Sequence, residues 1–303
     1  MEKKKVLLLG GSGFLGMSFA NYLIKEGYEP VILTRSAKEN DDKIKYVQWD
    51  GKTVDNWASE LEDAAAVVNF TGKSVNCIYT KKNKEEIIQS RLNSVKAIDD
   101  AIKRMTKRPP VVIQAGSLAI FGDTKKWCYE ESPHGSSFSV EVCQKWEDAF
   151  FKQDIEGVRK VLFRIGFALG KGGGALEPLL KLTKVGLGGT VGNGRQYISW
   201  LHIDDLNAML HKAIEDASMT GVYNASSTNP VTNREFMKEL RTVLHKRWSP
   251  PAPKLAVILG AYLFMRTEPS LALTGRRCYP KRLVDEGFTF QHTDLNKTLR
   301  ALI

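Results

Sequence analysis

The sequence predicts an α/β protein: a Rossmann-type, doubly wound parallel sheet followed by a smaller, mostly helical substrate lobe. Short apolar segments alternate with helical patterns through residues 1–165, as in repeated βαβ units. A glycine-rich turn directly follows the first apolar segment, and the alternation stops after Gly166. We therefore expect a nucleotide-binding domain at 1–165, with later strand and helix returns near 198–224. The lobe at 166–303 would include a helical domain at about 248–303.

Continuous apolar runs identify the strands, because a strand covered by helices on both faces is buried on both faces. The expected strands are Lys5–Leu9, Pro30–Thr34, Ile44–Gln48, Ala65–Phe70, Val111–Ala115 and Val158–Ile165. Apolar residues at helical spacing place helices between several of these strands. The expected helices are Phe14–Lys25, Lys81–Arg104 and Val140–Lys152.

The second half of the chain is richer in glycine turns. The expected elements are helices at Ala175–Lys184, Asp204–Ala217 and Thr232–Lys246, and a strand at Val222–Asn224. The prolines of residues 250–253 predict a hinge before an apolar helix near Leu255–Met265 and two short helical pieces.

Composition excludes several classes of protein. Of the 303 residues, 43% are apolar, which is enough to form a core and excludes a mainly disordered chain. The longest apolar run is shorter than the ~20 residues that span a bilayer, and Met1–Lys5 leads into a strand rather than a secretory signal. We therefore expect a cytoplasmic protein with no membrane partner. The four cysteines form no C-x-x-C pair, so we expect reduced thiols and no metal site.

The net charge of +10 is concentrated near the C-terminus, where residues 229–303 hold 13 Lys and Arg against 6 Asp and Glu. Such a lobe would suit an anionic ligand, but a solvated surface is an equally open interpretation. We expect no nucleic-acid partner, because no aromatic ladder or recognition motif accompanies the cations. The sequence does not indicate the oligomeric state.

The glycine turn carries the clearest functional signal. Gly10 permits the tight turn, Gly13 lets the backbone approach a pyrophosphate, and Gly16 allows close packing of helix on strand. The helix start then offers free N–H groups and a positive partial charge to the anion. The remaining expected cofactor contacts of this turn are Ser12, Phe14 and Leu15.

Arg35 indicates whether the protein binds NAD(H) or NADP(H). An acidic residue at the end of the second strand would favour NAD, but this chain has Arg35 followed by Ser36. A guanidinium can hold the 2′-phosphate of NADP(H) with forked, charge-assisted hydrogen bonds, and Ser36 adds a hydroxyl. We therefore expect NADP(H). Asp50, at the end of the third strand, could accept a hydrogen bond from the adenine amine or could cap its own turn.

Several motifs together resemble a known family. They are Gly10-x-x-Gly13-x-x-Gly16, Asn69-Phe70-Thr71-Gly72, Ser117-Leu118-Ala119-Ile120-Phe121-Gly122, Arg164-Ile165-Gly166 and His202-Ile203-Asp204-Asp205-Leu206. In this order they resemble the extended short-chain dehydrogenases/reductases of the NAD-dependent epimerase/dehydratase group. Further matches, including Gly194-Arg195-Gln196-Tyr197-x-x-Trp200 and Pro280-Lys281-Arg282, are similar to an atypical branch named only "epimerase family protein". Members of that branch carry a distinctive C-terminal domain.

The resemblance implies cofactor contacts that the residues alone do not identify. They are Phe70, Thr71, Gly72, Glu86, Arg91, Arg164 and Ala168, with Ala168 near the nicotinamide. For Glu86 and Arg91, a packing role or a surface ion pair is the alternative.

The usual catalytic pair of the superfamily is missing. The resemblance implies Tyr-x-x-x-Lys on the helix after the fifth strand, but Ser139 and Cys143 occupy these positions. Neither residue supplies an acidic phenol or a positive charge. Only Ser117 remains of the usual catalytic set. The candidate substitutes are Glu141, Cys143, Tyr197 and His202, although Cys143 also fits the core and His202 also fits a helix start.

The substrate should lie between the carboxyl edge of the sheet and the lobe. The expected lining residues beside Ser117 are Arg195, Tyr197, Trp200 and His202. They favour an anionic or nucleotide-linked small molecule. Two functions remain open: an NADP(H)-dependent oxidoreductase or epimerase of atypical mechanism, or a non-catalytic NADP(H)-binding sensor or interaction protein.

Overall fold

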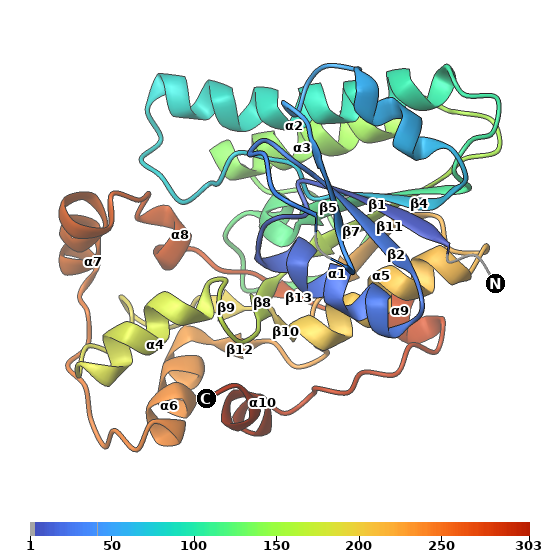
Figure 1. Cartoon of the computed structure of the whole chain (residues 1–303). Helices are drawn as coiled ribbons and strands as arrows, with labels where there is room; N and C mark the ends of the chain where they lie inside the picture. The colour runs from blue at the N-terminus through green and yellow to red at the C-terminus, as the bar shows by residue number, and fades with distance from the viewer. Residues whose placement is uncertain (1–3, 41) are drawn as a thin grey trace.

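A seven-stranded parallel sheet forms the centre of the molecule (Figure 1). The computed structural model describes residues 4–40 and 42–303, so Met1–Lys3, on which the signal-sequence expectation partly depends, lie outside the described residues. Across the sheet, the strands are β11 (Gly221–Ala225), β7 (Arg159–Ile165), β5 (Val111–Ser117), β4 (Ala64–Asn69), β1 (Lys5–Leu9), β2 (Glu29–Thr34) and β3 (Lys45–Gln48). The inner strands are almost completely buried, which explains their largely apolar sequences, whereas the edge strand β3 has no buried residue.

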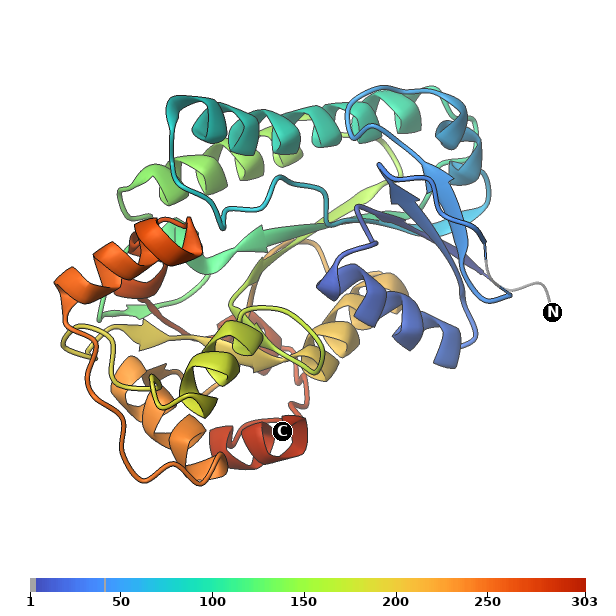
Figure 2. The same ribbon diagram turned by 60° about the vertical axis from the view of Figure 1, so that its left-hand side comes forward.

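Helices cover both faces of this sheet, as Figure 2 shows from a second direction. On one face lie α2 (Lys81–Lys103), α3 (Phe138–Lys152) and the short η1 (Asn56–Leu61). On the other face lie α1 (Phe14–Lys25) and α5 (Ile203–Glu215). The fold class expected from the sequence is confirmed.

The lobe has its own small core beneath the sheet. Its helices α4 (Leu176–Lys184), α6 (Asn233–Val243) and α10 (Leu295–Leu302) pack around Trp200 and Phe236. Its remaining helices are α7 (Lys254–Gly260), which continues as the π-helical turn η3 (Ala261–Met265), α8 (Ser270–Leu273) and α9 (Lys281–Asp285).

Two short strand pairs lie within the lobe, and a third joins the lobe to the central domain. They are β8 (Phe167–Leu169) with β10 (Trp200–His202), β9 (Tyr197–Ile198) with β12 (Val231–Thr232), and β6 (Trp127–Cys128) with β13 (Arg277–Cys278). Strands of two or three residues leave no periodic pattern, so most of these pairs could not be expected from the sequence. No helix within the described residues is long and apolar enough to cross a membrane.

The contact between Gly16 and Gly11 holds α1 against β1. A Cβ added at Gly16 would lie 2.4 Å from the Cα of Gly11. A backbone neighbour cannot rotate away, so either α1 or the turn must shift to accept a methyl group.

We expect Gly16→Ala to lower the free energy of unfolding by about 1–3 kcal/mol, the usual cost of overpacking. The measurement is urea unfolding followed by circular dichroism. Gly260→Ala is the matched control: Gly260 has helical angles and no atom lies within 4 Å of an added Cβ. It should leave stability unchanged or slightly raised. Equal effects of the two substitutions would contradict the packing argument.

Candidate functional site

The glycine turn lies where the carboxyl ends of β1 and β4 meet. Gly10 has a positive φ of 69° and donates its N–H to the Leu33 carbonyl at 2.9 Å. A Cβ on Gly10 would lie 2.9 Å from the Cα of Thr71, whereas nothing lies within 4 Å of one on Gly13. The turn is therefore closed by backbone on one side and open at Gly13, at the N-terminus of α1.

A polar network shapes the turn after β4. The fully buried Asn69 donates to Gln114 Oε1 at 2.9 Å and accepts from the Thr71 N–H at 3.0 Å. This bond orients Thr71 toward the glycine turn. Its buried Oγ1 has no hydrogen-bond partner among the described residues. An orphaned buried hydroxyl at this position points to a ligand that is not part of the chain.

Arg91 gives a second orphaned group at the same place. Its Nη1 donates to the carbonyls of Lys73 (3.1 Å) and Ile87 (2.9 Å), and its guanidinium lies 4.8 Å from the Trp146 ring centre. The position of a Cβ on Gly72 would be 3.0 Å from Arg91 Cζ, so this glycine lets the guanidinium approach the turn. Nε of Arg91 is buried and, within residues 4–40 and 42–303, unpaired.

These groups fit a dinucleotide. The free helix N-terminus at Gly13 and the unpaired Arg91 Nε suit phosphate oxygens, and the Thr71 hydroxyl suits a phosphate or ribose. The second glycine-rich loop lies beside them: Gly170, Gly173 and Gly174 pack so closely on the Phe14 ring that an added Cβ would come within 2.8 Å of it. Of the other turn residues, Ser12 hydrogen-bonds Thr34 at 3.1 Å and Leu15 and Phe70 are half-buried.

The part of the site that would hold the adenine half of the cofactor is more exposed than the glycine turn. Arg35 and Ser36 are exposed at the end of β2, free to reach a 2′-phosphate. Asp50 instead accepts hydrogen bonds from the N–H groups of Lys52 and Thr53, both at 2.8 Å. Of the two roles considered for Asp50, the structure shows the turn cap.

Two expected cofactor residues have structural partners. Arg164 is buried and donates to both carboxylate oxygens of Glu147, at 3.0 and 2.8 Å, which fixes α3 to β7. Glu86 forms an ion pair with Lys73, and this hydrogen bond lowers the pKa of its carboxyl group. The half-buried Ala168 lies in β8, beside Leu201 of β10.

The place of the usual catalytic pair holds neither a phenol nor an ammonium group. Ser117 caps η2 (Leu118–Phe121) by accepting from the Ala119 N–H at 3.2 Å. Cys143 is buried, and burial raises the pKa of its thiol to about 12, so it is neither a cation nor a ready nucleophile. Glu141 is exposed and pairs with Lys145.

The sequence analysis missed Tyr79, which the structure places beside Ser139. The Tyr79 ring contacts the Phe138 ring edge-on, with centroids 4.9 Å apart. Its hydroxyl is buried close to the Ser139 hydroxyl. Burial raises the pKa of Tyr79, while the nearby Ser139 hydroxyl and the Arg91 charge oppose the shift. No sequence signal singles out Tyr79, because it lies in an irregular loop sixty residues before Ser139.

Two cations of the C-terminal segment were also missed. Arg276 and Arg277 each have a buried Nε without a partner in the described part of the chain. Arg277 lies between the rings of Trp127 (3.8 Å) and Tyr197 (4.8 Å). Arg276, like Arg91, is close enough to Cys143 to lower its pKa against the effect of burial. These guanidiniums bring positive charge to the junction of sheet and lobe.

The expected pocket residues divide into two groups. Tyr197 lies at the junction beside Arg277, and Arg195 is exposed on the neighbouring turn. Trp200, however, is fully buried in the lobe core and donates to the Asn229 carbonyl at 2.9 Å, so its ring packs the core rather than lining a pocket.

His202 is a helix cap. Its Nδ1 accepts from the Asp204 N–H at 3.1 Å, and its ring stacks on that of His292 with centroids 3.7 Å apart. Burial, together with His292, lowers the pKa of His202 to about 4, so it is neutral at physiological pH. His202, Asp204 and His292 bring possible ligand atoms within 4.8 Å of one another. We assign them no metal, because stacked imidazoles direct their lone pairs side by side rather than to one point.

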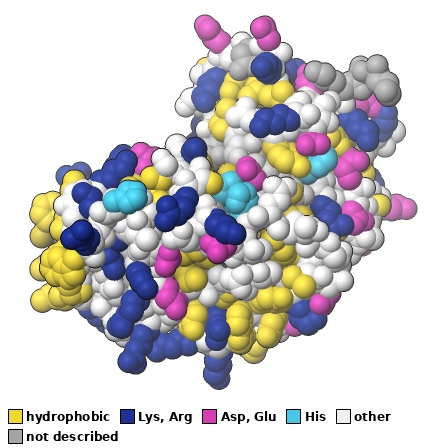
Figure 3. Space-filling view, turned by 90° about the horizontal axis from the view of Figure 1, so that it is seen from below, with side chains coloured by type: hydrophobic (Ala, Val, Ile, Leu, Met, Phe, Trp, Pro, Cys, Tyr) yellow, Lys and Arg dark blue, Asp and Glu magenta, His cyan; other side chains and the backbone are white. Residues whose placement is uncertain are grey.

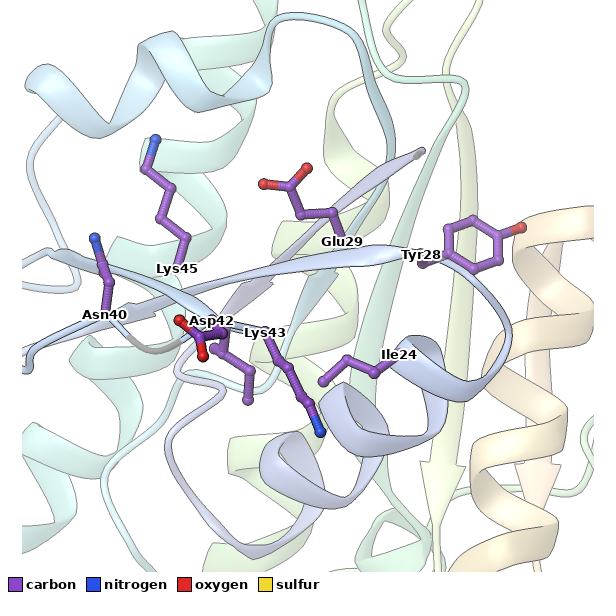
Figure 4. A pocket seen from close by; sticks show the side chains of 8 residues that line it. Ile24, Tyr28, Glu29, Asn40, Asp42, Lys43 and Lys45 are labelled. Atoms are coloured by element: carbon purple, nitrogen blue, oxygen red, sulfur yellow. The ribbon is translucent and has the colours of Figure 1, made fainter. Parts of the chain in front are cut away.

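A shallow hollow of about 390 Å³ lies elsewhere (Figure 4). It is lined by Ile24 and Tyr28 near the end of α1, by Glu29 at the start of β2, and by Asn40 and residues 42–45. It is at the amino end of β2, whereas ligands of open α/β sheets bind at the carboxyl ends. We therefore do not assign the cofactor to it.

Comparison with known proteins agrees with this geometry. The NAD dependent epimerase/dehydratase family matches residues 6–141, and a domain of unknown function matches residues 252–302. Epimerase family protein YfhF of Bacillus subtilis is 32% identical over 98% of this chain and 97% of its own. The crystal structure of human epimerase family protein SDR39U1 with NADPH has 27% identity and a TM-score of 0.88 over 98% of both chains. A nucleoside-diphosphate sugar epimerase from Corynebacterium glutamicum has 28% identity and a TM-score of 0.79 over 99% of this chain and 58% of its own.

The NADPH of the human relative agrees with the cofactor expected from Arg35, and the resemblance noted in the motifs is confirmed. Identity of this degree over nearly the full length of both chains shows that the protein belongs to the NAD-dependent epimerase/dehydratase family, in the branch of epimerase family proteins with this C-terminal domain.

Proposed function

We propose that this protein is an NADP(H)-dependent oxidoreductase that reduces a carbonyl group of a small anionic substrate. The observation that carries the proposal is the pair of orphaned buried groups, Thr71 Oγ1 and Arg91 Nε, beside the open glycine turn. A polar group buried without a partner costs about 1–3 kcal/mol, so both groups favour a ligand that pairs with them. The NADPH of the human relative supports the same assignment.

The charge of the substrate follows from Arg276 and Arg277. Their unpaired Nε atoms at the junction of sheet and lobe favour a phosphate or carboxylate on the substrate. The Corynebacterium relative is named as an epimerase of nucleoside-diphosphate sugars, a class that carries such phosphates. We therefore propose a phosphorylated or nucleotide-linked carbonyl compound.

Tyr79 is the proposed proton donor in place of the missing tyrosine. Bound NADPH supplies the hydride. The carbonyl oxygen then gains the proton of Tyr79 Oη, and water returns a proton to the phenolate. The Tyr79 hydroxyl carries its proton at neutral pH, as a donor for reduction must. Burial raises its pKa and so makes it a weaker acid, and the nearby Arg91 charge offsets part of this effect. Arg91 would stabilise the phenolate while it exists.

A non-catalytic NADP(H) sensor is the second candidate. The buried, neutral thiol of Cys143, at the position where other members of the superfamily need a lysine, favours it. Both candidate functions require bound NADP(H), but only the oxidoreductase would consume it in a reaction.

We expect Arg35→Ala to weaken NADPH binding about tenfold or more and to leave NADH binding unchanged, because only NADPH carries the 2′-phosphate. Nicotinamide fluorescence titration measures both dissociation constants. Arg104→Ala, an exposed arginine at the end of α2, is the control and should change neither. Parallel losses for NADPH and NADH would refute the assignment of Arg35 to the 2′-phosphate.

We expect wild-type protein to oxidise NADPH with a member of a panel of phosphorylated aldehydes, ketones and nucleotide-linked keto-sugars. Tyr79→Phe should then reduce the rate about 100-fold while NADPH affinity stays within about threefold, because the lost hydroxyl acts on the proton and not on the cofactor. Tyr129→Phe, an exposed tyrosine, is the matched control. Full activity of Tyr79→Phe would exclude Tyr79 as donor. No turnover with any member of the panel, despite tight NADPH binding, would favour the sensor.

A further inference from the structure

The chain exposes an apolar helix at the edge of its lobe. Ala261 is the single buried residue in α7 and η3. Phe264 is 86% exposed, Leu255 and Leu263 are 68% exposed, and Trp248, just before the proline hinge, is 73% exposed. Together with Leu259, Tyr262 and Met265, which are also exposed, these residues form what we call the α7 face. Several large apolar side chains exposed on one helix of a folded protein mark an interaction site.

Hydrogen bonds at both ends hold the α7 face in place. Before α7, Ala252 donates its N–H to Thr190 and accepts from Gly192, at 2.9 and 2.8 Å. After η3, the Thr267 hydroxyl donates to Asn76 Oδ1 in the loop that carries Tyr79. Figure 1 shows α7 at the outer edge of the molecule, away from the sheet. The α7 face is therefore a fixed, outward-facing surface.

The charges of the chain segment that carries this face all have one sign. Between Glu239 and Glu268 the chain contains no acidic residue. The cations of this stretch are Arg241, Lys246, Arg247, Lys254 and Arg266. In Figure 3, hydrophobic side chains gather on the same side of the molecule, with Lys and Arg around them. Exposed large apolar residues bordered by cations are typical of helices that lie in the interface of an anionic membrane.

We propose that the α7 face docks on an anionic lipid surface, with Phe264, Leu263 and Trp248 entering the headgroup region and the cations facing lipid phosphates. The absence of any helix able to span a bilayer, over the residues described, makes this a peripheral contact. The proposal differs from the sequence-based expectation of no membrane partner, which nothing in the structure tests. That expectation considered the length of the apolar run and not its exposure.

Two other occupants fit less well. A second copy of the chain would bring five cations of each protomer together, with no acidic residue between Glu239 and Glu268 to pair with them. An acidic protein would offer complementary charge. However, the most exposed apolar side chains project from a helix, not into a groove, and so resemble interfacial anchors more than a shaped protein interface.

The test is sedimentation of the full chain with phosphatidylcholine vesicles that contain about one third phosphatidylglycerol, compared with phosphatidylcholine alone. We expect binding to the anionic vesicles, at least about tenfold weaker binding to the neutral ones, and loss of binding at high salt. The double variant Leu263→Gln with Phe264→Gln should weaken binding about tenfold or more. Both side chains are exposed, so its thermal unfolding and NADPH affinity should match the wild type.

A second pair of variants tests how much the positive charge contributes to vesicle binding. Arg247→Gln with Lys254→Gln should weaken vesicle binding about tenfold. Lys25→Gln with Lys152→Gln removes the same charge from exposed positions on α1 and α3 and should change binding less than about threefold.

Three results would overturn the proposal. One is no sedimentation with anionic vesicles at low salt, and another is binding that the Leu263 and Phe264 substitutions leave intact. The third is a wild-type dimer, seen by light scattering, that these substitutions dissociate, because the occupant would then be a second copy. Vesicle binding that polyglutamate abolishes, without dependence on Leu263 and Phe264, would point to an acidic protein instead.

Discussion

Backbone packed against backbone at the carboxyl ends of β1 and β4 is the constraint on which the site depends. Gly10 meets the backbone of Thr71, and Gly16 meets that of Gly11, at separations that leave no room for a Cβ. These contacts place the start of α1 and the turn after β4 around one space. Gly72 then admits the Arg91 guanidinium to it. The positions of the orphaned hydroxyl and guanidinium thus follow from glycines, which contribute no side chain of their own.

The sequence predicts those features that short-range pattern determines. The strands of the sheet and the glycine turn are local, because burial on both faces and tight turns each leave a signature within ten residues. Contacts between residues that are distant in the sequence leave no such local signature. Arg164 is fixed by Glu147 and Trp200 by the lobe core, so their motif positions did not reveal their surroundings. Tyr79 and Arg276 reach the site from segments that carry no motif.

Cys143 shows how the site departs from its superfamily. In place of a lysine ammonium, α3 presents a thiol whose pKa burial raises to about 12. Positive charge is nevertheless present, since Arg91 of α2 and Arg276 of the C-terminal segment both act on that thiol. A guanidinium keeps its charge under burial far better than an ammonium does. The electrostatic role of the lysine can therefore pass to other elements without leaving the site.

The C-terminal segment connects this chemistry to the surface. The Gly275 N–H donates to Asp123 Oδ1 at 2.9 Å, and the Gly275 carbonyl accepts from the Thr124 N–H at 2.9 Å. These bonds fix Arg276 and Arg277 beside the sheet domain. The bond from Thr267 to Asn76 ties the end of η3 to the loop of Tyr79. One covalent stretch therefore carries both Arg276 and Arg277 and the α7 face. The C-terminal domain therefore brings two guanidiniums to the junction of sheet and lobe and exposes an apolar helix at the surface.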